Sequence, residues 1–87
     1  MIRKYVKRPI AIEVVQYTGD NWGEILDFTQ GRAIFADKNE QIELIIHTLE
    51  GDMHAQVGAY IAKGPHGEFY PIQREVFEET YVEVENV

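Results

Sequence analysis

The strongest strand pattern in the chain is QIELIIHTLEGDMHAQV, residues 41–57. Apolar and polar side chains alternate on both sides of Glu50-Gly51-Asp52, as in two antiparallel strands joined by a tight turn. A two-residue loop at Glu50-Gly51 places His47 opposite His54. It also gathers an apolar face of Ile42, Leu44, Ile46, Met53, Ala55 and Val57. The opposite face is expected to be partly hydrated and contains Glu43, Ile45, His47, His54 and Gln56. A loop shifted by one residue is expected to mix apolar and polar side chains on each face, so the pattern favours this register.

Before the hairpin, the sequence predicts a strand at 10–18, a helix at 21–30 and a short strand at 32–36. Asp20 or Asn21 can cap the helix, with Trp22 and Phe28 as its contributions to the core.

After the hairpin, strands at 60–63 and 68–72 flank the turn Gly64-Pro65-His66-Gly67, in a register that pairs Lys63 with Glu68. Pro71 is expected to end this ladder. One or two helical turns follow at 74–79, with Val76 or Phe77 facing inward, and a last strand is expected at 80–85.

These elements predict a single domain over residues 1–87, because no linker, repeat or low-complexity segment divides the chain. The predicted fold class is α+β: a small twisted antiparallel sheet or partial barrel with one short helix packed on it.

Composition excludes several functions. The 87 residues contain no cysteine and no serine, so the common acyl-transfer nucleophiles are absent and no enzyme activity or cofactor is predicted. No long apolar run and no signal-peptide pattern is present, so we expect a cytoplasmic protein with no membrane partner. Residues 1–8 carry a charge of +4, and the rest carries 4 basic and 15 acidic residues, a charge of −11. Such an acidic body argues against non-specific nucleic-acid binding.

The basic N-terminal arm (residues 1–8) and nearby aromatic residues form one candidate ligand site. Arginine and lysine recognise phosphate, and aromatic rings stack on bases. The candidate contacts are Arg3, Lys7, Arg8, Tyr17 and Trp22. The simpler alternative is an exposed lead-in segment whose charges pair with the acidic body.

His47 and His54 form a second candidate. Opposed on one hairpin face, two imidazoles could share a metal ion, with Glu43 or Gln56 as a further ligand. A hydrated polar pair is the simpler explanation, and no metal site is assigned. The acidic residues Glu75, Glu78, Glu79, Glu83 and Glu85 favour a solvated surface, or a mimic of an acidic ligand that occupies a basic groove on a partner.

Several motifs together resemble a widespread family of small bacteriophage and prophage proteins without an assigned activity. They are Arg8-Pro9, Val15-Gln16-Tyr17-Thr18-Gly19, Thr48-Leu49-Glu50-Gly51-Asp52-Met53, Gly64-Pro65-His66-Gly67-Glu68-Phe69-Tyr70-Pro71, Phe77 and Thr80-Tyr81. The chain departs from the family pattern at Val57-Gly58-Ala59, where Pro-Gly-Asp is expected, and at Ile72, where a cysteine is expected. The resemblance implies a phage-encoded cytoplasmic protein and no particular chemistry.

We therefore expect a non-enzymatic phage or prophage binding module that engages a host defence or regulatory protein. One alternative is an oligomeric sponge that sequesters a signalling nucleotide through the arm. Another is a weak metal-dependent enzyme at His47 and His54. A homodimer through exposed sheet edges is also possible on this pattern.

Overall fold

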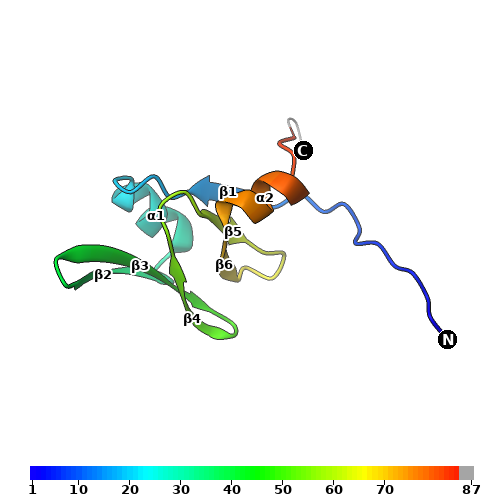
Figure 1. Cartoon of the computed structure of the whole chain (residues 1–87), viewed down its shortest axis with the longest axis horizontal. Helices are drawn as coiled ribbons and strands as arrows, with labels where there is room; N and C mark the ends of the chain where they lie inside the picture. The colour runs from blue at the N-terminus through cyan, green and yellow to red at the C-terminus, as the bar shows by residue number, and fades with distance from the viewer. Residues whose placement is uncertain (85–87) are drawn as a thin grey trace.

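The computed structural model describes residues 1–84 and contains two three-stranded antiparallel sheets and two short helices (Figure 1). The α+β class is confirmed, but the strands divide between two sheets with the orders β1-β5-β6 and β2-β3-β4. Along the chain the elements are β1 (Glu13–Gln16), α1 (Trp22–Thr29), β2 (Ala33–Lys38), β3 (Gln41–Thr48), β4 (Gly51–Ala55), β5 (Tyr60–Lys63), β6 (Phe69–Ile72) and α2 (Arg74–Thr80).

The β3–β4 hairpin forms where expected, but its predicted register is wrong. Thr48 pairs with Gly51 and His47 with Asp52, so the loop is Leu49-Glu50. The positive φ of the turn falls on Gly51 (φ 109°), after the two central residues rather than within them. Because this shift moves each partner by two positions, every side chain keeps its face. The separation of apolar and polar side chains between the two faces therefore could not distinguish the predicted register from the observed one.

The β5–β6 hairpin deviates for a similar reason. Gly67 donates to the Gly64 carbonyl oxygen at 3.1 Å and has φ 80°, which adds one residue to the second side of the turn. Lys63 therefore pairs with Phe69, and the predicted Lys63–Glu68 pair is wrong. Pro71 does not end the ladder but pairs with Ile61 inside β6. Proline is tolerated there because β6 is the last strand of its sheet.

One core fills the space between the inner faces of the two sheets and α1. Ile25 and Thr29 are the fully buried residues of this helix, and the Thr29 hydroxyl donates to the Ile25 carbonyl oxygen at 2.8 Å. Phe28 packs at the edge of the core against Phe69, as expected of a core residue. Trp22 does not enter the core, since its ring is partly exposed. The fully buried strand residues are Leu44, Ile46, Ile61 and Ala62.

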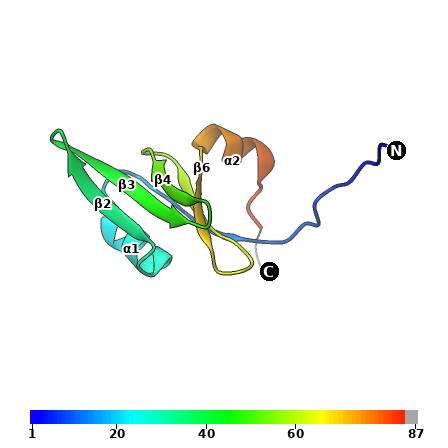
Figure 2. The same cartoon turned by 90° about the horizontal axis from the view of Figure 1, so that it is seen from below.

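The α2 helix covers the outer face of the β1-β5-β6 sheet, as Figure 2 shows beside β6. Of the two residues predicted to face inward, Phe77 does so and stacks on Tyr60 with ring centroids 3.9 Å apart, whereas Val76 is exposed. The predicted final strand is wrong. The helix continues to Thr80, Tyr81 stacks on Phe77, and residues 81–84 form no strand. Glu85, the end of that predicted strand, lies outside the described residues.

The first strand is shorter than predicted, because β1 pairs only along the four residues of β5 and the ladder ends at the Glu13–Lys63 pair. Residues 1–12 precede it as an extended segment that leads away from the two sheets (Figures 1 and 2). With 8 and 7 residues, α1 and α2 are too short to cross a membrane, and they are the helices of residues 1–84.

Candidate functional site

A groove runs between β4 and β6 and consists of two adjoining cavities of about 380 and 330 Å³. Met53 and Pro71 line both cavities and join them into one feature. The first cavity extends toward the loop after β4 and the start of α2, and the second toward the β3–β4 turn. We call this feature the β4–β6 groove. Its size is within the range of small ligand sites.

The two strands beside this groove are both edge strands. In the described part of the chain, β4 pairs only with β3, and β6 pairs only with β5. An edge strand presents backbone donors and acceptors that can pair with another extended chain. Pro71 removes one donor from β6, so the five residues of β4 form the better edge for strand addition.

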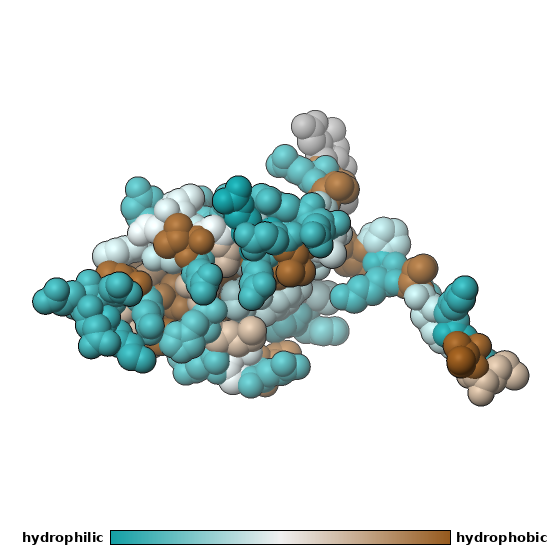
Figure 3. All heavy atoms as spheres, in the orientation of Figure 1, coloured by the Kyte–Doolittle hydropathy of each residue, from teal (hydrophilic) through white to brown (hydrophobic). Residues whose placement is uncertain are grey.

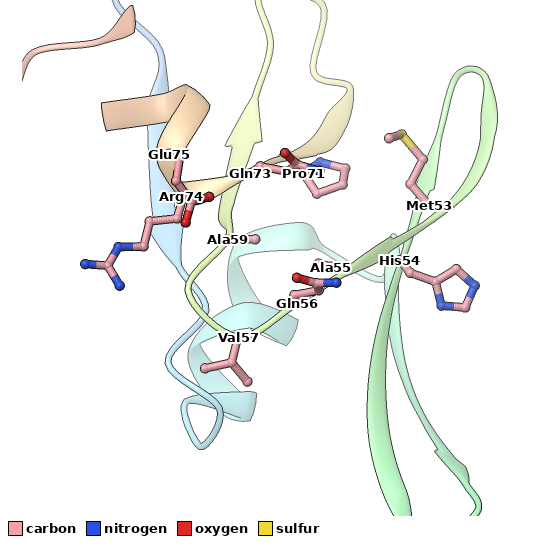
Figure 4. A pocket seen from close by; sticks show the side chains of 10 residues that line it. All are labelled: Met53, His54, Ala55, Gln56, Val57, Ala59, Pro71, Gln73, Arg74 and Glu75. Atoms are coloured by element: carbon pink, nitrogen blue, oxygen red, sulfur yellow. The ribbon is translucent and has the colours of Figure 1, made fainter. Parts of the chain in front are cut away.

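Met53 provides an apolar contact in the groove. Its side chain is 42% exposed, and Figure 4 shows it pointing from β4 toward the Pro71 ring, while His54 points to the opposite side of the strand. Leu49 adds further exposed apolar surface at the turn beside the second cavity. Contiguous exposed apolar surface beside polar residues is typical of binding sites.

Acidic side chains lie around this apolar surface. Glu50 and Glu68 line the second cavity and Glu75 lines the first. The nearby cation, Arg74, turns its guanidinium away from the groove in Figure 4 and lies 3.5 Å from the Glu78 carboxylate. The rim therefore has an excess of negative charge, which favours a cationic occupant.

Tyr70 lines the second cavity beside Glu68. Burial raises the pKa of the Tyr70 hydroxyl, and the Tyr81 hydroxyl and the Glu68 carboxylate raise it further. The hydroxyl therefore stays neutral and can donate a hydrogen bond at physiological pH.

The two histidines do not face each other as predicted. His47 lies opposite Asp52, with its Nδ1 2.6 Å from the carboxylate, and His54 lies opposite Ile45, with its Nδ1 3.5 Å from the Glu43 carboxylate. The register shift at Gly51 causes this change, so the geometric basis of the metal-enzyme alternative is wrong. Across residues 1–84, no three His, Asp or Glu side chains are grouped so that they could hold a metal ion.

The other predicted ligand residues are not brought together in one chain. Arg3, Lys7 and Arg8 lie in the exposed arm, which leaves the body at the end of β1 remote from α1 (Figure 1). Tyr17 is only 3% exposed and packs against Phe35, so its ring has no open face for a ligand. Trp22 stacks on Phe35, and its indole N–H donates to the Gly19 carbonyl oxygen at 3.0 Å.

The sequence did not predict the β4–β6 groove. Met53 was assigned to the apolar face of the hairpin, which is correct, and Pro71 to the end of a ladder, which is wrong. Neither pattern indicates that these two residues, from different sheets, border one cavity. A proline in a short predicted strand was the available signal for an exposed edge.

No family model, curated protein or solved structure matches this chain. The likeness to phage and prophage proteins therefore rests on the motifs in the sequence. The function is argued below from the groove and from the distribution of charge.

Proposed function

We propose that this chain is a non-enzymatic binding module, encoded by a phage or prophage, that holds a host defence or regulatory protein in the cytoplasm of the host bacterium. The observation that carries the proposal is the unpaired edge of β4 beside a groove whose second cavity is mainly apolar and whose rim is acidic. An extended segment of the partner pairs with β4 and lies against Met53.

Strand addition suits this site because backbone hydrogen bonds supply affinity and flanking pockets supply specificity. The five residues of β4 can pair with a segment about 17 Å long. Side chains on alternate positions of that segment then point into the two cavities, against Met53 and Pro71.

The chemistry of the rim selects a basic segment. Glu50, Glu68 and Glu75 attract lysine or arginine, and the apolar walls accept valine, isoleucine or tyrosine between them. The formal net charge of −7 adds long-range attraction for such a partner. A segment that alternates cationic and apolar residues therefore fits both properties of the groove.

Titration with a synthetic peptide tests this proposal. The probe is a seven-residue peptide that alternates Lys or Arg with Val or Tyr, and the same peptide with Glu in place of each cation is its control. We expect amide shifts in NMR spectra to concentrate in residues 51–55 and 69–72, with the β4 amides protected from exchange. The acidic peptide should bind weakly.

A matched pair of variants distinguishes binding in the groove from non-specific binding to the surface. Met53→Asn should weaken peptide binding about tenfold or more, because it places a polar group on the apolar wall and leaves the charge of the groove unchanged. Ile34→Asn introduces the same side chain at a similarly exposed strand position on the other face of its sheet and should leave binding unchanged. Shifts spread over the surface, or equal binding of both peptides, would contradict the proposal.

A further inference from the structure

The N-terminal arm exposes apolar side chains that no other part of residues 1–84 covers. Tyr5 is 82% exposed and Val6 is 95% exposed. Among residues 1–84, no hydrogen bond or ion pair connects residues 1–7 to the body. The space-filling view in Figure 3 shows this arm projecting from the body, with apolar residues between hydrophilic ones. The arm is therefore an extended segment that pairs with no other part of the described chain.

Its positive charge matches the acidic rim of the β4–β6 groove. The arm carries Arg3, Lys4, Lys7 and Arg8, a charge of +4, whereas the rest of the chain carries −11. In an extended conformation Ile2 and Val6 lie on the same side of the arm, because they are four residues apart and side chains alternate with a period of two. Pro9 marks the end of the segment that can pair, because a three-residue turn closes there with the Ile10 N–H donating to the Arg8 carbonyl oxygen at 2.9 Å.

We infer that the arm of one copy occupies the β4–β6 groove of a second copy. The arm pairs with β4, its cations lie near Glu50 and Glu68, and Val6 contacts Met53. Because the arm leads away from its own sheets in both views, it is presented to another molecule (Figures 1 and 2).

This inference rests on the proposed function of the groove and adds a regulation of it. A host segment must displace the arm, so binding of the host protein and self-association compete for one site. The complex with the host protein therefore forms most readily at concentrations of this chain below the dissociation constant of its dimer.

Sedimentation velocity of the full chain tests self-association. We expect a dimer that dissociates as NaCl rises from 0.1 to 1 M, because screening shortens the electrostatic range from about 10 to about 3 Å. Val6→Asp and Met53→Asn should each weaken the dimer about tenfold or more. Val82→Asp makes the same change as Val6→Asp at an exposed valine in the segment after α2 and should leave the dimer intact.

Methyl labelling shows where the arm lies. The chain has two methionines, Met1 in the arm and Met53 in the groove, so methyl-labelled protein gives one probe at each end of the contact. In a mixture of labelled and unlabelled chains, we expect intermolecular NOEs between the Met53 methyl group and Val6. A monomer, or NOEs only within one chain, would overturn the inference.

The two proposals fail separately. If the full chain is monomeric but the Val6→Asp chain still binds the basic peptide at Met53, the arm inference is wrong and the groove function stands. If the peptide does not shift the Met53 signal of the Val6→Asp chain, the groove function itself is wrong.

Discussion

At Tyr70, the surroundings decide how one side chain titrates. Burial, the Tyr81 hydroxyl and the Glu68 carboxylate, in that order, raise the pKa of the Tyr70 hydroxyl. Tyr17 is the same residue type directly after the end of β1, and it serves instead as a core aromatic against Phe35. The sequence pattern treated Tyr17 as a ligand contact because it cannot report which ring face is covered.

The raised pKa of Tyr70 predicts a loss of stability in alkali. Below the usual tyrosine pKa near 10, both folded and unfolded chains hold the proton and the contribution is complete. As the pH rises through the folded pKa, the unfolded chain releases its proton first, so stability falls. Tyr70→Phe should reduce this fall, measured as the free energy of unfolding in urea between pH 9 and 11.

The control for Tyr70 is Tyr5→Phe, which removes a hydroxyl from an exposed ring in the arm. Its stability should fall with pH as steeply as that of the natural chain. An equal slope in the Tyr70→Phe variant would mean that the Tyr70 hydroxyl does not titrate differently in the folded state.

At the scale of the elements, a glycine follows the turn of each hairpin whose register differs from the prediction. Gly51 and Gly67 each have positive φ immediately after two central turn residues. Gly51 pairs with Thr48, which makes Leu49-Glu50 the loop, whereas Gly67 adds a residue to the second side of its turn. The alternation that predicted the strands has period two, so it fixes the face of each side chain and leaves shifts of two positions undetermined. The strands were therefore predictable, whereas the partner of His47, which differs by two positions, was not. The partner of Lys63 differs by one position because of the extra residue at Gly67, which alternation within the strands does not report.

Two glycine substitutions should have opposite effects on stability. Gly51→Ala forces a side chain into φ 109° and should destabilise the fold by about 1–2 kcal/mol. Gly23→Ala lies in α1 with no atom near the new Cβ and should stabilise it by about 0.5–1 kcal/mol. Urea denaturation measures both changes. A stabilising effect of Gly51→Ala would show that the positive φ at this turn is not required.

For the whole molecule, the arrangement of the two sheets creates both the core and the groove. Ile46 and Leu44 from one sheet meet Ile61 and Phe69 from the other, while β4 and β6 lie near each other without forming a ladder. Each strand pattern reports local burial, but the distance between two edges depends on how the sheets pack. The charge separation that we assign to the arm and the groove was visible in the sequence, and the place where the charges could meet was not.

A core shared by both sheets predicts that they unfold together. Ile61→Ala removes a fully buried side chain from β5 and should cost about 2–5 kcal/mol. Trp22 fluorescence reports on the α1 and β2 side through Phe35, and near-ultraviolet circular dichroism reports on the Tyr60–Phe77–Tyr81 stack beyond the other sheet. Both signals should shift to lower urea concentration by the same amount.

Ile61→Val keeps this test measurable if the alanine variant does not fold, with an expected loss of about 0.5–1.5 kcal/mol. Ile34→Ala, at a partly exposed position on the outer face of the β2-β3-β4 sheet, should cost less than Ile61→Ala because less of its side chain leaves contact with the protein. If the Trp22 transition stayed in place while the tyrosine transition moved, the sheets would be separate folding units. The groove between them would then lack the rigid walls that strand addition to β4 requires, because its two edges belong to different sheets.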